Sequence, residues 1–328
     1  MIRLATYNVK WFDDLFTSKN ELKTGAETGK RLDAIADAFR LMDADFIGLV
    51  EGPNSGGAQS GPKKVQAFAK EYGLRTRKAL IGVPSQGRQE IIAMYDPDVV
   101  AVTTKKGRAT ARNPAFDQPF EIDSDDDGIR EIYRHYRPPL EVEATSKRSG
   151  RKLRIIVVHI KSKGIFSNMD RLNWERASRR NRLKIIAEAT SVRRRVDAML
   201  RDGDDVVVMG DVNDGPGMDY YEFRYAKSGV ELIMGDAFDP DAILRNYAGK
   251  PTFGRFGWTP SSARFVDQFT EKPVNVLIDH ILVSKGVKTS GETPHRVWNP
   301  FEDDEAGALK EELRAASDHF PISLDIRD

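Results

Sequence analysis

The sequence predicts an α/β protein in which two packed β-sheets carry helices on their outer sides. Short apolar runs of four to eight residues are typical of buried strands. Strands alternate with helical patterns early in the chain, and closely spaced strand candidates at residues 80–104 and 140–160 indicate antiparallel pairs. Because no internal repeat or low-complexity linker divides the 328 residues, we expect a single domain over residues 1–328.

The spacing of apolar side chains predicts the elements of the first half. Residues 2–9 form an apolar run that predicts a strand. Residues 30–42 predict a helix, because Leu32, Ile35 and Phe39 recur at helical spacing. The elements expected next are a strand at 46–50, a helix at 63–72 and strands at 80–83, 90–95 and 99–104.

A polar segment interrupts this pattern near the middle of the chain. Residues 107–129 contain few apolar side chains, so we expect them to form an excursion from the core. The elements expected after it are strands at 140–144 and 153–160, a long helix at 173–200, and strands at 206–209, 274–283 and 322–326.

Composition excludes several kinds of chemistry and leaves the partner open. The chain has no cysteine, which excludes disulfides, thiolate metal sites and cysteine nucleophiles. Its 51 Lys and Arg nearly balance its 50 Asp and Glu, so net charge indicates no partner. No run approaches the about 20 apolar residues that a membrane span needs. The N-terminus has no signal-peptide shape, so we expect a cytoplasmic protein without membrane insertion, unless a leader preceded this sequence.

Polar side chains follow the strand candidates at the points where they end. Six apolar runs each finish on a carboxylate, an amide or a histidine. These residues are Asn8, Glu51, His159, Asp211 with Asn213, Asp279, and Asp318 with His319. Open α/β sheets gather their chemistry at strand ends. A fold that brought these ends together would bind a divalent metal and hydrolyse a phosphate ester.

The segment Gly210-Asp211-Val212-Asn213-Asp214-Gly215 is the strongest local signal. Asp211 could accept a proton from attacking water, and the Asn213 amide could donate to a phosphate oxygen. The alternative is a polar turn, because these residue types also form turns without any chemical role.

Two Asp-His pairs, Asp279-His280 and Asp318-His319, lie further along. Adjacent residues on an extended strand face opposite ways, so neither pair need be bonded to itself. We expect Asp279 to orient His319, as carboxylates orient histidines in hydrolase triads, and Asp318 to reach a metal. For His280, and likewise for His135 and His295, we expect a structural role.

His159 precedes Lys161 and Lys163 in an apparent turn. An imidazole followed by lysines suits contact with an anionic phosphoryl group; the alternative is a strand-end histidine beside a solvated basic loop. Glu51 is an oxygen ligand of the type that Mg²⁺ prefers. Asn8 could orient the metal ligands or the phosphate, or could cap its own turn.

Taken together, these stretches resemble the endonuclease/exonuclease/phosphatase superfamily, and the Lys161 turn resembles its bacterial nuclease-like members. The matching stretches occur in the family's order and span nearly the whole chain: Thr6-Tyr7-Asn8-Val9, Gly48-Leu49-Val50-Glu51, Val158-His159-Ile160-Lys161-Ser162, Gly210-Asp211-Val212-Asn213-Asp214, Ile278-Asp279-His280-Ile281-Leu282 and Ser317-Asp318-His319-Phe320-Pro321. The resemblance implies a four-layered α/β sandwich, with two mixed sheets face to face and helices on both outer sides. It also implies Mg²⁺ or Mn²⁺ as the cofactor.

The resemblance further implies a role for each site residue. Glu51 would be the main metal carboxylate, with Asn8 and Asp318 beside it. The other implied roles are these: Asp211 and Asn213 align the attacking water and the phosphoryl oxygen, His319 and His159 handle protons, Glu90 supports His159, and Arg137 with Lys161 faces the phosphate.

A basic segment at residues 171–195 bears on the substrate. It holds nine cations: Arg171, Arg176, Arg179, Arg180, Arg182, Lys184, Arg193, Arg194 and Arg195. On one helix face they would track a nucleic-acid backbone, with Trp174, Phe166 and the pair Tyr220/Tyr221 available to stack on bases. The alternative is a solvated outer helix.

A second acidic segment offers a further cation site. Asp123, Asp125 and Asp127 precede Gly128 and resemble the opening of a calcium loop, although Arg134 stands where the loop would need a glutamate. An additional Ca²⁺ there is one interpretation, and a solvated acidic loop is the other.

Three functions therefore remain open from the sequence. The first is a metal-dependent nuclease whose substrate is nucleic acid, acting as a monomer. The second is a phosphatase or phospholipase C-type enzyme of a small-molecule or lipid phosphoester. The third, which the complete set of strand-end residues disfavours, is a non-catalytic binding module on the same scaffold.

Overall fold

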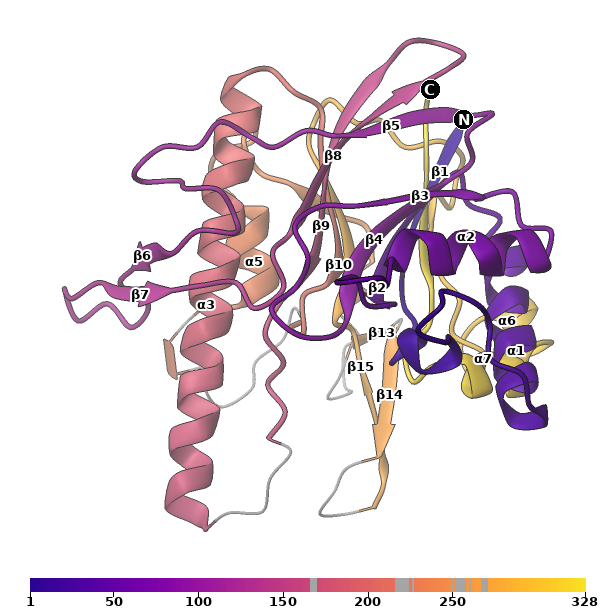
Figure 1. Cartoon of the computed structure of the whole chain (residues 1–328). Helices are drawn as coiled ribbons and strands as arrows, with labels where there is room; N and C mark the ends of the chain where they lie inside the picture. The colour runs from indigo at the N-terminus through magenta and orange to yellow at the C-terminus, as the bar shows by residue number, and fades with distance from the viewer. Residues whose placement is uncertain are drawn as a thin grey trace.

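The chain forms two six-stranded mixed β-sheets that pack face to face, as the computed structural model in Figure 1 shows. The first sheet contains, from edge to edge, β17 (His295–Val297), β18 (Ile322–Ile326), β1 (Ile2–Asn8), β2 (Phe46–Gly52), β4 (Glu90–Tyr95) and β3 (Lys78–Ile81). The second contains β11 (Arg245–Asn246), β16 (Asp279–Val283), β10 (Val206–Asp211), β9 (Lys152–His159), β8 (Leu140–Ser146) and β5 (Val100–Thr104). The structure describes residues 1–165, 170–215, 224–225, 227–248, 250–251, 258–259, 261–266 and 271–328.

Helices cover the outer side of each sheet (Figure 1). The first sheet carries α1 (Ala26–Met42), α2 (Gly61–Glu71), α6 (Asp304–Gly307) and α7 (Lys310–Ala316), and the second carries α3 (Arg171–Arg201) and α5 (Gly229–Met234). The smaller elements are the 3₁₀ turn η1 (Phe12–Leu15) and the pairs β6 (Phe120–Ile122) with β7 (Glu131–Tyr133), β12 (Lys250–Pro251) with β13 (Trp258–Thr259), and β14 (Ala263–Val266) with β15 (Pro273–Val276). The predicted four-layered sandwich is confirmed.

The two-residue period of the strands divides the apolar side chains between the cores. On β1, Leu4 packs between the two sheets, while Ala5 and Tyr7 face the helices. On β2, Gly48 leaves room for the opposite sheet, because a Cβ there would lie only 2.9 Å from a Val157 methyl carbon. The sheets therefore approach closely just above the strand ends that carry the polar residues.

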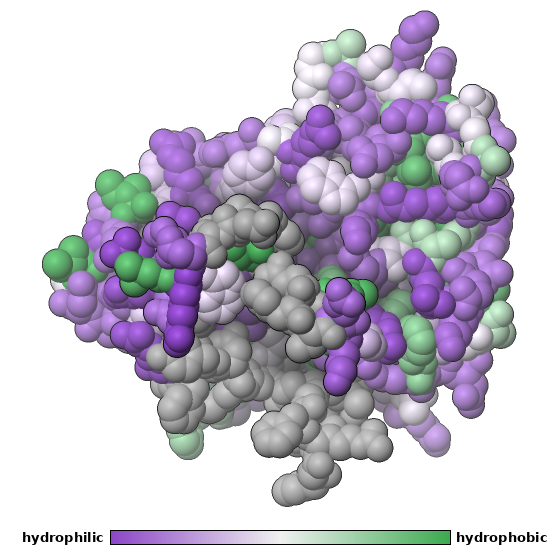
Figure 2. All heavy atoms as spheres, turned by 90° about the horizontal axis from the view of Figure 1, so that it is seen from below, coloured by the Kyte–Doolittle hydropathy of each residue, from purple (hydrophilic) through white to green (hydrophobic). Residues whose placement is uncertain are grey.

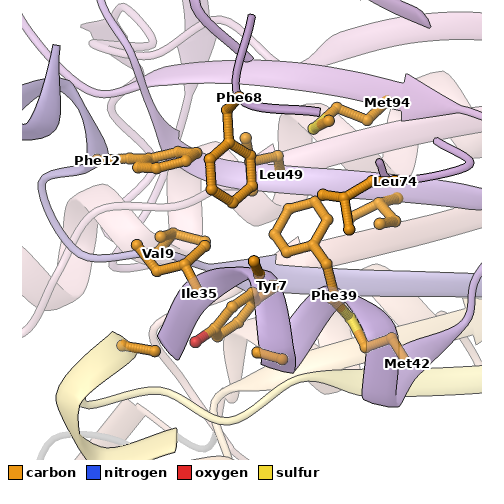
Figure 3. Packing of buried hydrophobic residues seen from close by; sticks show 14 of the residues in the cluster. Tyr7, Val9, Phe12, Ile35, Phe39, Met42, Leu49, Phe68, Leu74 and Met94 are labelled. Atoms are coloured by element: carbon orange, nitrogen blue, oxygen red, sulfur yellow. The ribbon is translucent and has the colours of Figure 1, made fainter. Parts of the chain in front are cut away.

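The outer core of the first sheet is rich in aromatic side chains (Figure 3). One face of α1 presents Ile35 and Phe39 to Tyr7 of β1. Phe39 also meets Phe68 of α2 edge to face, with ring centroids 5.7 Å apart. Edge-to-face pairs of this kind add about 0.5–1.5 kcal/mol to the burial of the rings, and they fix both helices against the sheet that carries Asn8 and Glu51.

Most predicted elements are present, with three corrections. Helix α1 begins at Ala26 rather than at residue 30. The excursion at 107–129 includes strand β6, which pairs with β7 outside the two main sheets. The expected strand at 274–283 is two strands: β15 forms a hairpin with β14, and β16 joins the second sheet. The chain changes direction between them, so Asp279 begins a strand instead of ending one.

The two ends of the chain meet in the first sheet. Ile2 of β1 is registered with Ile326 of β18. The first and last strands of the chain are therefore neighbours in the same sheet. None of the helices in the described ranges is long and apolar enough to cross a membrane. The single domain over residues 1–328, the monomeric state and the cytoplasmic location stay predictions.

Candidate active site

The polar side chains lie where the core between the sheets ends. In the second sheet His159, Asp211 and Asp279 occupy one row across three neighbouring strands, because Asp211 is registered with both of the others. His159 and Asp211 stand two residues beyond Val157 and Met209, which belong to the core between the sheets. They therefore continue the core-facing rows of β9 and β10 and point towards the first sheet.

Side chains from the first sheet meet this row. Asn8, at the end of β1, donates from Nδ2 to Oδ2 of Asp211 at 3.0 Å. His319 Nδ1 lies 2.8 Å from Oδ2 of Asp279, and the Ser262 hydroxyl donates to the same oxygen at 2.8 Å. The Asp279–His319 pairing that the sequence predicts is thus present, and Asp279 receives its own support from the β14 side.

The surrounding charges favour a protonated His319. Burial lowers its pKa, but the charge and hydrogen bond of Asp279, together with the charges of Asp211 and Asp318, outweigh this effect and raise the pKa to about 10. Asn8 Nδ2 lies 3.4 Å from His319 Nε2, a contact that could be a hydrogen bond only with the neutral ring. Because that contact is long and three carboxylates surround the ring, we assign the imidazolium form.

Asp211 is the carboxylate best suited to exchange a proton near neutrality. Burial raises its pKa, and the nearby charge of Asp279 raises it further against the opposing charge of His319, to about 7. A backbone N–H from Asn213 and the Asn8 amide donate to its two oxygens. A general base works best when its pKa lies near the working pH.

His159 remains a neutral imidazole. Burial, followed by the positive charges of Arg137, His319 and Lys161, holds its pKa well below the ordinary value. Its Nε2 lies 3.7 Å from Oδ2 of Asp211, and its buried Nδ1 has no hydrogen-bond partner within the described ranges. A neutral ring in this position could donate or accept a hydrogen bond at a phosphoryl oxygen without adding charge.

The predicted supporting role of Glu90 is wrong in its geometry. Its carboxylate accepts hydrogen bonds from the backbone N–H groups of Ser55 and Ser85, at 3.2 and 2.8 Å, and not from His159. Glu90 begins β4 of the first sheet, where it pairs with Gly52, whereas His159 ends β9 of the second sheet. Glu90 therefore fastens the loops that flank Glu51.

A β-bulge brings Glu51 into the site. The β2–β4 register shifts between Leu49 and Gly52, and Glu51 itself has a left-handed backbone with φ 55°. Bulges commonly redirect a side chain beside a functional site. The Glu51 carboxylate accepts from Trp11 N at 2.9 Å and from Gln89 Nε2 at 2.6 Å, both on Oε2.

Left-handed backbone is concentrated at this cleft. Of the eight non-glycine residues with positive φ in the described chain, four line it: Trp11, Glu51, Gln89 and Asn213. Such conformations cost about 1–3 kcal/mol each and persist at sites whose surroundings hold them in place. Their grouping supports a functional cleft independently of any sequence motif.

The cleft has a volume of about 620 Å³ and a strongly charged lining. Its cationic side chains are Lys10, Arg137, Lys161 and Lys184, and its acidic ones are Glu51, Glu188, Asp211 and Asp318. Figure 2 views the molecule from the end towards which β9 runs, where hydrophilic side chains dominate the described surface. This lining suits an anionic ligand better than an apolar one.

The residues predicted to face the phosphate all lie at the cleft. Arg137 donates from Nη1 to Oε1 of Gln89 at 2.5 Å, and its buried Nε has no partner among the described residues. Lys161 Nζ donates to the carbonyl oxygen of Ser162 at 2.8 Å. The Asn213 amide donates to Ile160 O at 3.0 Å, which leaves one of its two N–H groups for a ligand.

Oxygen ligands at the edge of the first sheet fit Mg²⁺ or Mn²⁺ by their donor chemistry. Glu51 accepts its hydrogen bonds on Oε2, so Oε1 has no partner within the described part of the chain. Asp318 accepts from Lys10 Nζ on Oδ2 at 2.6 Å, and its Oδ1 is similarly available. Asn8 Oδ1 accepts from Lys10 N at 3.1 Å and from no other group in the described ranges.

A second group of ligand atoms lies deeper in the same cleft. Ligand atoms of Asp211, Asp279 and His319 approach within 4.8 Å of one another. Because Asp279 and His319 already share a hydrogen bond, this group is better suited to move protons than to hold an ion. Glu51 and Asp318 remain the freer carboxylates.

The prediction that the nine cations of residues 171–195 form one nucleic-acid face is wrong. Four of these cations are used inside the protein: Arg182 pairs with Asp214, Arg195 is buried, and Arg193 and Arg194 donate to backbone carbonyls. The nine cations do not form one nucleic-acid face, because α3 packs against the second sheet from Ile185 to Met199 (Figure 1).

The remaining cations lie near the cleft end of α3. Arg171, Arg176, Arg179 and Arg180 are exposed on its first turns, and Lys184 lines the cleft. Trp174 is half-buried on the same turns. The other residues expected to stack on bases, Phe166, Tyr220 and Tyr221, lie outside the described residues.

The acidic segment brings Asp123, Asp125 and Asp127 together, with carboxylate oxygens within 4.8 Å of one another. Backbone N–H groups from 127 and 128 already occupy both oxygens of Asp123. Arg179 binds Asp125 at 2.8 Å. The group thus resembles a solvated acidic loop tied to α3, and Ca²⁺ there stays a prediction.

Sequence reasoning missed three residues that hold the site together. Gln89 bridges Glu51 and Arg137, Ser262 supports Asp279, and Lys10 pairs with Asp318. No spacing rule marks Ser262 or Gln89. Lys10, two residues after Asn8, could have been found as a cation beside an expected metal ligand.

Gln89 yields a direct prediction. Replacing Gln89 by Asn keeps an amide that tolerates the left-handed backbone but shortens its reach to Glu51 and Arg137. We expect kcat/KM to fall about 10- to 100-fold, as when other supporting partners of metal ligands are lost, and the metal concentration for half-maximal activity to rise. Steady-state kinetics across a Mn²⁺ titration measures both. The exposed Gln86→Asn variant, from the same loop, should behave like the parent; equal kinetics for both variants would remove Gln89 from this role.

The fold and the cleft define a class of protein: an α/β sandwich hydrolase with a carboxylate–histidine centre and cations placed for an anionic substrate. The model of the Endonuclease/Exonuclease/phosphatase family matches residues 173–319. This match contains Asp211, Asn213, Asp279 and His319, and it agrees with the resemblance to this superfamily that the sequence predicts. That family consists of metal-dependent hydrolases.

Solved structures show the same fold at low sequence identity. TDP2 from Caenorhabditis elegans matches with a TM-score of 0.52 and 12% identity, covering 100% of this chain and 74% of that chain. ANGEL2, described as a 2′,3′-cyclic phosphatase, matches with a TM-score of 0.52 and 11% identity, covering 98% and 94%. A truncated C. elegans TDP2 matches with a TM-score of 0.50 and 11% identity, covering 100% and 98%. No curated protein matches the sequence.

Proposed function

We propose that this chain is a nuclease that hydrolyses phosphodiester bonds by direct attack of water, with Mg²⁺ or Mn²⁺ as its cofactor. The observation that carries the proposal is the row His159–Asp211–Asp279, completed by His319 from the chain's last turn before β18. It places a proton acceptor, a protonated imidazole and a neutral imidazole around one end of a strongly charged cleft. These groups can activate the attacking water and stabilise the phosphoryl oxygens during in-line hydrolysis of a phosphate ester.

The protein groups divide the chemistry between them. Asp211, held by Asn8 and the Asn213 N–H, accepts the proton of the attacking water. His319, fixed by Asp279, presents a positively charged N–H towards the phosphoryl oxygens, where charge grows in the transition state. Groups that bind more tightly as charge develops are the ones that accelerate the reaction.

The metal would be held by Glu51 and Asp318, with Asn8 beside them. When bound, a divalent ion polarises a phosphoryl oxygen and stabilises the leaving oxygen. Lys10 presently neutralises Asp318, so an ion arriving there would compete with this ammonium group. Arg137 and Lys161 would still face the phosphate from the opposite wall of the cleft.

Nucleic acid is the substrate we favour, and one surface supports it. The first turns of α3 project beyond the sheets at the cleft end of the molecule (Figure 1) and carry exposed Arg171, Arg176, Arg179 and Arg180. A phosphodiester backbone leaving the cleft could follow these charges. A small phosphoester would use the cleft alone, and ANGEL2, described as a 2′,3′-cyclic phosphatase, shows that the fold is compatible with such chemistry.

Metal removal tests the proposal. Purified protein should hydrolyse bis(p-nitrophenyl) phosphate and cut plasmid DNA or RNA in Mn²⁺ or Mg²⁺, and chelation by EDTA should abolish both activities. Returning the metal should restore them. Hydrolysis that survives EDTA would refute the metal-dependent mechanism. Turnover of the small diester or of phosphomonoesters, with every polynucleotide left intact, would replace nuclease by a small-phosphoester hydrolase.

A further inference from the structure

A second charged cleft lies away from the catalytic one. It has a volume of about 710 Å³ and is bounded by the loop between β5 and β6 and by the last turns of α3. The two clefts share no lining residue. Their nearest lining residues on α3 are Glu188, in the catalytic cleft, and Arg194, in the second cleft, which lie about 9 Å apart along the helix.

Five arginines line this second cleft: Arg108, Arg112, Arg130, Arg194 and Arg201. We call them the arginine cluster. The side chains of all but Arg194 are exposed, and these four make no side-chain hydrogen bond or ion pair anywhere in the described part of the chain. Arg194 differs because it donates to the carbonyl oxygens of Arg112 and Glu121, at 3.3 and 3.1 Å. It thereby ties to α3 the β5–β6 loop, which carries Arg108 and Arg112.

Cations outnumber acids in this cleft, whose lining holds five arginines against Glu121, Asp197 and Asp202. Burial lowers the pKa of Arg194, and the charges of Arg130 and Arg112 lower it further, with no acidic neighbour opposing them. Of the three acids in the lining, Asp197 is bonded by Arg193 from outside the cleft. Arg75, by contrast, is paired with Asp43, Asp45 and Asp96.

The shape and the chemistry indicate a ligand class. Volumes of about 300–1,000 Å³ are typical of pockets for small ligands or for part of a polymer. Unpaired guanidinium groups arranged around such a space match the paired oxygens of phosphate groups, which arginine binds with two parallel hydrogen bonds. A ligand with a single carboxylate group could bind only one or two of the five arginines.

We propose that the arginine cluster is a second anion-binding site, which takes two or more linked phosphate groups outside the catalytic cleft. The ligand chemistry is a phosphoanhydride or phosphodiester chain, and its source is a soluble polyphosphate or the backbone of a nucleic acid. This site operates whether or not the catalytic cleft is a nuclease. Arg194 shapes the site, while Arg112, Arg130 and Arg201 supply exposed donors.

The test is a charge-matched comparison in the full chain. Arg112→Gln/Arg130→Gln/Arg201→Gln removes three cations from the cluster, and Arg40→Gln/Arg77→Gln/Arg148→Gln removes three from other faces. Inorganic tripolyphosphate binding is measured by calorimetry, and binding of a short labelled oligodeoxythymidylate by anisotropy at several salt concentrations, both in EDTA. Circular dichroism and activity on bis(p-nitrophenyl) phosphate should be the same for both variants and the parent.

We expect the cluster variant to lose at least about tenfold in affinity, with the control near the parent. Weakening only for tripolyphosphate identifies a compact polyphosphate. Weakening for the oligonucleotide, with a salt slope smaller by about 2, identifies a nucleic-acid backbone. Equal binding by the two variants on both probes overturns the proposal. If the triple variant is less stable, the single variants Arg112→Gln and Arg130→Gln replace it, each expected to weaken binding about threefold.

Discussion

Replacing His319 by Ala should lower kcat/KM for phosphoester hydrolysis by about 10²- to 10⁴-fold, the range that a positioned acid or base contributes. The physical reason is the geometry around the ring. His319 Nδ1 is held by Asp279 at 2.8 Å, which leaves Nε2 directed at the space beside Asp211. Alanine removes the positive N–H from the place where negative charge develops, and no other described side chain takes its position.

Two comparisons make this result specific. Asp279→Asn should lower kcat/KM in the same direction and should also lower the pKa of His319, which Asp279 now raises; NMR titration of the ring would report that shift. His295→Gln changes a histidine of β17, at the edge of the first sheet and outside the cleft lining, and should leave kcat/KM of the folded protein unchanged. Undiminished turnover by His319→Ala would refute our assignment of the site.

Much of this site could be predicted because its residues follow from strand register. His159, Asp211 and Asn8 each continue a row of core-facing side chains at the end of an apolar run, and a period of two places such rows without knowledge of the fold. Asp279 was harder to place, because the expected strand at 274–283 is two strands and Asp279 begins the second of them. Its pairing with His319 was nevertheless predictable, because neighbouring Asp and His on a strand point apart.

The positions of the other site residues depend on tertiary contacts that the spacing of residues in the sequence does not reveal. Glu51 reaches the cleft through a bulge and a left-handed backbone, not through strand alternation. Glu90 was predicted to support His159, but the two residues stand on different sheets, a separation that only the strand order reveals. Gln89 and Ser262 act through single hydrogen bonds across the fold. The arginines of α3 looked alike in the sequence because burial is a tertiary property.

Arg195 tests whether a buried arginine of α3 stabilises the fold and does not bind substrate. Replacing it by Ala should lower the free energy of unfolding by about 3–5 kcal/mol, the usual cost of removing one partner of a buried ion pair. Its side chain is fully buried, and its Nε lies 3.5 Å from Oε1 of Glu141. Its other nitrogens donate to the carbonyl oxygens of Arg108 and Pro114, at 3.2 and 2.9 Å. Alanine would leave two carbonyl groups without their donor and the buried Glu141 carboxylate without its cationic partner.

Urea unfolding of three variants tests this account. Arg176→Ala, on the exposed part of the same helix, should change stability by no more than about 0.5 kcal/mol. The double variant Arg195→Met/Glu141→Gln should be less destabilised than Arg195→Ala, because it removes both charges and restores apolar volume. Were Arg195→Ala as stable as the parent and instead weaker in nucleic-acid binding, Arg195 would belong to a binding surface after all. We expect the reverse, because a guanidinium enclosed by Phe116, Glu141 and backbone carbonyls cannot reach a phosphate.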